Sequence, residues 1–100
     1  MKLPKTKIFN SLEAKSIIFD YRNKGKKVVF SNGCFDIIHK GHETYLKAAR
    51  ELGDFLIIGL NSDSSVQQLK GLNRPIIDQS NRAINLLKLD FVDAVTIFSE

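Results

Sequence analysis

The stretch NGCFDIIHKGH, residues 32–42, lies between a predicted strand and a predicted helix. Residues 27–32, just before it, are short and apolar or β-branched at their centre, which predicts a strand buried on both faces. Apolar residues then return at helical spacing from Gly41 to Leu52, and Gly53 offers a left-handed end to that helix. We therefore expect this stretch to form a strand-to-helix turn.

Further helices and strands are predicted on both sides of this turn. Strand, helix and strand in close succession form a βαβ unit, whose strands run parallel with a right-handed crossover. The fold class expected is α/β, a Rossmann-like three-layer sandwich around a parallel sheet of at least three strands. The other predicted segments are a helix over 10–24, a strand over 55–60, a short helix over 62–68, a loop over 71–75, a helix over 79–89 capped by Asp78, and a strand over 92–98.

Length and composition are those of one globular domain. The chain has 100 residues, of which 43% are hydrophobic and 26% charged, so residues 1–100 are expected to form a single domain. Apolar runs such as residues 55–58 are too short to cross a bilayer, and no signal-peptide pattern follows the basic N-terminus. We expect a cytoplasmic protein with no membrane partner. The single cysteine, Cys34, cannot form an internal disulfide and is expected to be a small buried residue.

Charge is distributed unevenly along the chain. Residues 1–50 carry eleven basic and four acidic side chains, whereas residues 51–100 carry four basic and seven acidic ones. Such a split is typical of a nucleic-acid surface, of a site for a phosphate-rich substrate, or of a solvated basic face around Lys24, Lys26 and Lys27. The charge pattern leaves these three alternatives open.

Ligands of parallel α/β sheets bind at the carboxyl ends of the strands, which here are residues 33–42 and 61–63. Gly33 would let the backbone approach a ligand closely, and the N-terminus of the following helix offers N–H groups and a positive dipole end. This combination predicts an anion site.

Two histidines, His39 and His42, flank Gly41 at the start of that helix. Histidine donates hydrogen bonds to phosphoryl oxygens in either protonation state, and Gly41 keeps the adjacent space free. Fixed donors of this kind suit nucleotidyl transfer, which needs charge stabilisation at phosphorus and no protein nucleophile. Alternatively, the histidines are capping or surface residues, or form a metal cluster with Cys34 and Asp36. A zinc site is disfavoured because the chain has one cysteine.

Other nucleotide-binding motifs are absent from the sequence. It contains no GxGxxG and no GxxxxGK[ST], so a dinucleotide oxidoreductase and a P-loop ATPase lack local support.

The tetrapeptides GCFD, residues 33–36, and HKGH, residues 39–42, resemble the GxFD and HxGH signature of the cytidylyltransferase-like nucleotidyltransferase superfamily. Residues 61–63, 69–71, Arg74-Pro75 and Arg82 also fall in that family's order. Within it the chain is most similar to the adenylyltransferases of ADP-heptose synthesis. The resemblance implies that AMP passes from ATP to heptose 1-phosphate with Mg²⁺, giving ADP-heptose and pyrophosphate. Glycerol-phosphate and ethanolamine-phosphate cytidylyltransferases share the first motif, so CTP and another small phosphate remain an alternative.

Residue by residue, the resemblance implies catalytic roles for His39, His42 and Lys70, which would hold the triphosphate and stabilise the transition state. No metal ligand is expected directly from the protein, since Mg²⁺ would arrive with ATP. The residues expected to contact the nucleotide are Asn32, Gly33, Cys34, Phe35, His39, Gly41, His42 and Arg82, and those expected to contact the acceptor are Asp36, Asn61, Asp63 and Lys70.

Several of these residues have a plainer interpretation. Asp36 and Asp63 could orient a histidine, bind magnesium through water, or cap a turn. Lys70 could be an ordinary surface lysine, and Arg82 an exposed helix residue paired with Asp78.

Relatives continue past this point into a strand, a helix and a Ser/Thr-rich phosphate-binding turn, whereas this sequence stops at Glu100. We therefore expect the domain to lack its C-terminal strand and helix, which leaves an exposed sheet edge or a homodimer contact. Binding of nucleotide without turnover is a further alternative. So is a nucleic-acid-binding module, because class I aminoacyl-tRNA synthetases share a similar HxGH element. The aromatic residues argue against the module, since most occupy core positions and do not alternate with Lys and Arg.

Overall fold

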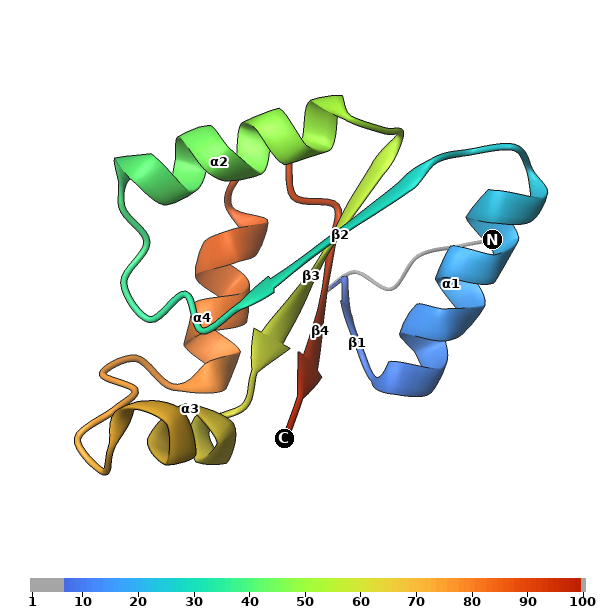
Figure 1. The fold of residues 1–100 in the computed structure, drawn as a ribbon. Helices are drawn as coiled ribbons and strands as arrows, with labels where there is room; N and C mark the ends of the chain where they lie inside the picture. Colours follow the sequence, from blue (N-terminus) through green and yellow to red (C-terminus); the bar gives the residue numbers. More distant parts are fainter. Residues whose placement is uncertain (1–6, 100) are drawn as a thin grey trace.

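Helices cover both faces of a four-stranded parallel sheet in the computed structural model, which describes residues 7–99 (Figure 1). The strand order is β1-β4-β3-β2, and every neighbouring pair is parallel. This confirms the expected α/β class with a parallel sheet. The ends of the expected domain range, residues 1–6 and 100, lie outside the described residues. The elements are β1 (Ile8–Phe9), α1 (Ser11–Asn23), β2 (Val28–Gly33), α2 (Lys40–Glu51), β3 (Phe55–Asn61), α3 (Asp63–Lys70), α4 (Gln79–Leu87) and β4 (Ala94–Phe98).

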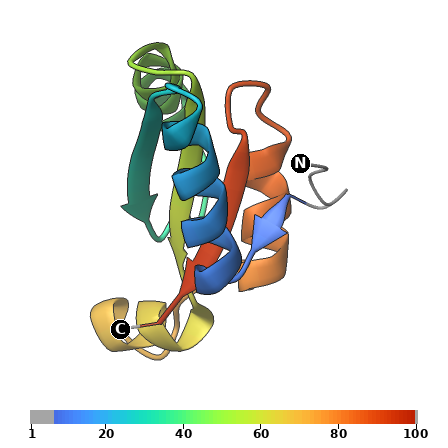
Figure 2. The ribbon, with the colours of Figure 1, turned by 90° about the vertical axis from the view of Figure 1, so that its right-hand side faces the viewer.

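The elements form three layers. Helix α1 packs against one face of the sheet, while α2 and α4 pack against the other face (Figure 2). Helix α3 lies beyond the carboxyl ends of β3 and β4 (Figure 1). No helix among residues 7–99 is long and apolar enough to span a membrane.

Strand β3 is the centre of the core, because all seven of its residues are buried. Its side chains alternate between the two faces of the sheet. Phe55 and Ile57 join the cluster under α1, whereas Leu56, Ile58 and Leu60 join the larger cluster under α2 and α4. The continuous apolar run that predicted this strand is therefore the consequence of helices on both sides.

Strand β2 differs from the prediction that it is buried on both faces. Phe30 is 55% exposed, and Asn32 is exposed as well. The physical reason is the position of β2 at the end of the sheet, where no strand within residues 7–99 pairs with its outer side. The expected exposed edge is therefore present in this part of the chain.

Element ends also differ from expectation in places. Strand β1 was not predicted, because two residues are too few to show a period. Helix α3 extends to Lys70, and α4 ends at Leu87. Gly53 is not left-handed as expected; instead, a Cβ there would lie 2.7 Å from the Lys27 carbonyl oxygen, so close backbone approach explains this glycine.

Replacing Leu86 by alanine should test the core assignment. Leu86 is fully buried between α4 and the sheet, so Leu86→Ala should lower the free energy of unfolding by about 2–5 kcal/mol. The matched change Leu12→Ala removes a side chain that is 78% exposed and should alter stability by less than about 0.5 kcal/mol. Urea unfolding of both variants measures the difference, and equal losses would contradict this core.

Candidate functional site

A cavity of about 570 Å³ lies at the carboxyl end of β2, beside the N-terminus of α2. Three of its lining residues were not predicted to be site residues: Ile37, Tyr45 and Arg74. The predicted residues that line it are Asn32, Gly33, Cys34, Phe35, Asp36, His39, His42 and Lys70. The fold thus brings together eight of the twelve residues expected at the site, and we call this cavity the cleft.

The two histidines cap helix α2. Nδ1 of His39 accepts a hydrogen bond from the Gly41 amide at 3.0 Å, and Nδ1 of His42 accepts one from the His39 amide at 3.3 Å. The imidazole rings stack with centroids 3.9 Å apart. Because each Nδ1 is an acceptor, each neutral ring carries its proton on Nε2. The capping interpretation is therefore correct, and it leaves one N–H donor on each ring for a ligand.

Gly41 is required by the close packing of His39. A Cβ at this position would lie 2.9 Å from Cε1 and 3.0 Å from Nδ1 of the His39 ring. The space beside Gly33 is used in a similar way, since a Cβ there would lie 2.9 Å from Cε2 of Phe35. The structure therefore explains both glycines by the side chains that they accommodate, while contact of Gly33 with a nucleotide stays a prediction.

Phe35 has a left-handed backbone, with φ of 46°. This conformation is rare for a bulky residue and marks a position that the surrounding structure must hold. The side chain is directed into the core, where the residue is only 8% exposed, and its ring meets His42 edge to face at 5.4 Å. Phe35 thus forms the apolar wall behind His42.

The environment of His42 favours the neutral imidazole. Burial lowers the pKa of His42 below its ordinary 6.5, and the nearby charges of His39 and Lys70 lower this pKa further. The ring is therefore mostly neutral at pH 7, with Nε2–H as its donor.

Asp36 holds the loop that follows α3. Its carboxylate accepts hydrogen bonds from the amides of Ile76 and Ile77, both at 2.9 Å, and pairs with Arg74 at 3.3 Å. Burial alone would raise the pKa of Asp36, but these amides and the Arg74 guanidinium outweigh it, so the pKa lies below the usual 3.8. Of the three roles considered for Asp36, turn capping is the one observed; contact with an acceptor stays a prediction.

Two basic side chains line the cleft, one from the end of α3 and one from the loop that follows it. Lys70 lies in the last turn of α3 and is exposed, and the Arg74 side chain is 45% exposed beside Asp36. The sequence offered a signal for Arg74, a basic residue four positions after Lys70. Tyr45 belongs to the apolar helical pattern of residues 41–52, yet it is 60% exposed at the cleft. Cys34 is partly buried and lines the cleft, contrary to the expectation of a buried residue.

Arg82 does not line the cleft. It is fully buried, with 0% exposure, and its guanidinium pairs with Asp63 at 2.8 Å, not with Asp78 as the alternative interpretation had it. Its other hydrogen bonds go to the carbonyl oxygens of Cys34, Asn61 and Ile77 at 2.7, 2.9 and 2.8 Å. This arrangement offers no guanidinium surface to a nucleotide, which differs from the expected role.

Asn61 is also buried, and its side-chain amide donates to Ser65 at 2.9 Å. Asp63 is partly exposed at the start of α3, where it faces Arg82. Neither residue lines the cleft, so their contact with an acceptor has no support from this geometry. Within residues 7–99 no three His, Cys, Asp or Glu side chains are grouped closely enough to hold a metal ion, so Cys34, Asp36 and the histidines form no such cluster.

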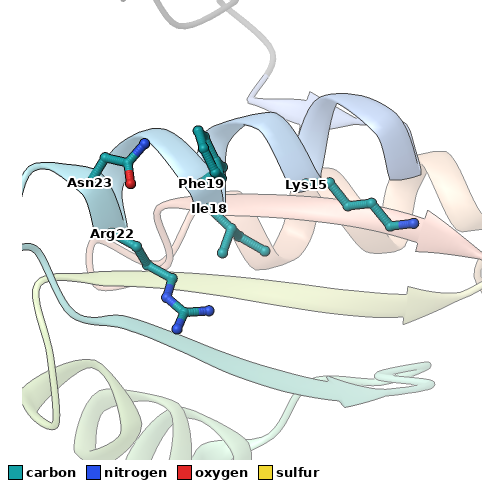
Figure 3. A pocket seen from close by; sticks show the side chains of 5 residues that line it. All are labelled: Lys15, Ile18, Phe19, Arg22 and Asn23. Atoms are coloured by element: carbon teal, nitrogen blue, oxygen red, sulfur yellow. The ribbon is translucent and has the colours of Figure 1, made fainter.

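A second cavity, of about 560 Å³, lies along α1 and contains none of the motif residues. Figure 3 shows Ile18 and Arg22 reaching from α1 toward the strands, with Phe19 on the outer side. Lys26 and Lys27 line a neighbouring hollow at the amino end of β2. That end is roughly 20 Å from the cleft along a six-residue strand, so the basic first half of the chain is not concentrated at the histidines.

A parallel sheet with paired histidines where a strand leads into a helix places the chain in the class of nucleotidyltransferase-like α/β domains. The chain belongs to the cytidylyltransferase-like family, whose model matches residues 30–100. The expected family is thereby confirmed.

Curated relatives agree with this assignment. The bifunctional protein HldE of Trichlorobacter lovleyi is 53% identical over 95 residues, which cover 95% of this chain and 19% of that protein. The bifunctional protein HldE of Campylobacter concisus is 58% identical over 90 residues, which cover 90% of this chain and 19% of that protein. The chain thus spans about a fifth of the length of these relatives.

A solved structure has the same fold. The lipopolysaccharide core biosynthesis protein from Thermoplasma volcanium GSS1 is 34% identical and superposes with a TM-score of 0.68. The match covers 74% of this chain and 59% of that one.

The lowered pKa of His42 predicts a pH dependence of stability. As pH falls below 6.5, the unfolded chain takes up a proton on this residue before the folded protein does, so stability should decrease until the folded pKa is passed. NMR titration of the imidazole C–H signals gives the midpoint of His42, and urea unfolding at pH 5–8 gives the stability. His42→Gln should show a shallower loss over this range. A His42 midpoint at or above 6.5 would contradict the structure.

Proposed function

We propose that the cleft binds a nucleoside triphosphate and transfers its nucleoside monophosphate to a sugar phosphate, with release of pyrophosphate. The observation that carries this proposal is the histidine pair at the start of α2. Both rings are fixed by bonds to Nδ1 and stacked at 3.9 Å, so two Nε2–H donors have a set geometry beside Lys70. Preorganised donors of this kind favour a reaction in which charge builds up on phosphoryl oxygens.

In the proposed reaction an oxygen of the acceptor phosphate attacks the α-phosphorus of the nucleotide. A new P–O bond forms as the bond to the bridging oxygen breaks, and pyrophosphate leaves with the electron pair. The histidine donors stabilise charge on the triphosphate, and Lys70 and Arg74 supply positive charge at the same cleft. No protein nucleophile is required.

Magnesium is part of this proposal. We propose that the ion arrives with the nucleotide and is held by its phosphate oxygens, the hard oxygen ligands that Mg²⁺ prefers. When bound there, Mg²⁺ neutralises phosphate charge and helps to orient the triphosphate. Lys70 and Arg74 of this chain would add to the positive charge that Mg²⁺ brings to the triphosphate.

For the substrates we propose ATP and heptose 1-phosphate, giving ADP-heptose. The support is the resemblance of the GCFD, HKGH and Lys70-Gly71 to Arg82-Ala83 segments to the adenylyltransferases of ADP-heptose synthesis, together with identities above 50% to proteins named HldE. A cytidylyltransferase acting on a small phosphate such as glycerol phosphate is the alternative, and nucleotide binding without turnover is the second.

Pyrophosphate release tests this proposal. Pyrophosphate should appear only when the protein, ATP, Mg²⁺ and heptose 1-phosphate are mixed, and His42→Ala should slow its release by at least about 100-fold because an oriented donor is lost. Lys70→Met should slow it about 10- to 100-fold through loss of a charged hydrogen bond. Lys88→Met is the matched control, since Lys88 is an exposed cap residue of α4 that does not line the cleft.

The outcomes separate the alternatives. Release with CTP in place of ATP would replace adenylyl by cytidylyl transfer, and calorimetric binding of ATP without release would indicate binding alone. A folded His42→Ala protein with full activity would exclude the histidine mechanism.

A further inference from the structure

We propose that Arg82 is a positioning residue of the cleft: through the Cys34 carbonyl it fixes the left-handed backbone of Phe35, and through the Phe35 ring it sets His42. This inference rests on the proposed function only for its effect on nucleotide binding. Its effect on the two imidazole rings concerns the unliganded protein and stands separately.

The guanidinium of Arg82 joins four segments that are distant in the sequence. It donates to Cys34 after β2, to Asn61 at the end of β3, to Asp63 at the start of α3 and to Ile77 before α4. All four bonds are 2.7–2.9 Å long, and the residue is fully buried. Such a set requires the planar fork of arginine, because a lysine ammonium has three donors on one atom and cannot span the same acceptors.

Arg82 and Asp36 together close a ring of contacts around Phe35. Asp36 binds the amides of Ile76 and Ile77, while Arg82 binds the Ile77 carbonyl and the Cys34 carbonyl. Cys34 and Asp36 are the two neighbours of Phe35 in the chain, so both sides of this residue are tied to the same loop.

This ring supplies what the conformation of Phe35 needs. A bulky side chain with φ of 46° persists only where the surroundings hold it. The held backbone directs the Phe35 ring over Gly33, where a Cβ would come within 2.9 Å, and against His42 at 5.4 Å. His42 in turn accepts the His39 amide and stacks on the His39 ring, so the position of Phe35 affects both histidines.

The substitution Arg82→Lys tests this inference, because it keeps the charge while removing the fork. The matched control is Arg50→Lys at the opposite end of β3, where Arg50 pairs with Asp93 at 2.9 Å and donates to the Gly53 carbonyl at 2.7 Å. The chain contains two histidines, His39 and His42, so the imidazole NMR signals report on the cleft alone. The charged or titratable side chains that line the cleft with His42 are those of Cys34, Asp36, His39, Tyr45, Lys70 and Arg74, and neither substitution changes them.

Both variants should unfold at lower temperature than the unsubstituted protein. Only Arg82→Lys should raise the titration midpoint of His42 toward 6.5, because a released Phe35 no longer buries the ring. It should also weaken Mg²⁺-ATP binding at least about tenfold in calorimetry, as expected when two oriented donors lose their geometry. Arg50→Lys should leave the His42 midpoint and ATP binding unchanged.

A purely structural role for Arg82 makes the opposite prediction. If Arg82→Lys lowers the melting temperature as Arg50→Lys does and leaves the His42 midpoint unchanged, the inference is wrong. If Arg82→Lys does not fold, Arg82→Gln serves instead, since it buries no charge and its shorter amide cannot reach the Cys34 carbonyl together with the other acceptors. An unchanged His42 midpoint in that variant also refutes the inference. Failure of the unsubstituted protein to bind ATP would refute the proposed function, whereas the His42 titration would still decide the role of Arg82.

Discussion

The buried guanidinium of Arg82 is the interaction on which the carboxyl edge of the sheet depends. Carbonyl groups at strand ends and in loops have no ladder partner, and a buried polar group without a partner is destabilising. Arg82 donates hydrogen bonds to three such carbonyls and to the carboxylate of Asp63. It thereby provides a partner for a polar group in each of four segments, and Asp63 compensates its charge. The turn that carries the histidines, the start of α3 and the start of α4 therefore form one unit.

The choice of helix caps shows how the cleft differs from the rest of the fold. Three helices begin with residues that are preferred N-caps: Asn10, Ser62 and Asp78. Helix α2 begins with His39, whose ring caps through one nitrogen and leaves the other as a donor. An aspartate in this place would put negative charge where an anion is proposed to bind. A histidine cap keeps the helix start ordered without that repulsion.

Local patterns predicted most of the elements, because β3 is apolar throughout and the cap at Asp78 is visible in the sequence. They also predicted an anion site at His39 and His42, since ligands of parallel sheets bind at the carboxyl ends of the strands. Lys70 was expected at this site from the family resemblance alone. The burial of β2 could not be predicted, because it depends on the order of strands in the sheet. The position of Arg82 was missed for a similar reason, since its acceptors come from residues 34, 61, 63 and 77.

The stacked geometry disfavours a positive charge on both imidazoles at once. Two unit charges 3.9 Å apart repel by about 4 kcal/mol at an effective dielectric constant of 20, so a doubly protonated pair would be driven apart. Burial beside Phe35 lowers the pKa of His42 and keeps this ring uncharged near pH 7. A neutral ring with Nδ1 as acceptor still donates through Nε2, so no donor is lost. Positive charge at the cleft then comes from Lys70 and Arg74, whose long side chains can adjust to the position of a phosphate. The histidines provide hydrogen-bond donors with a fixed orientation.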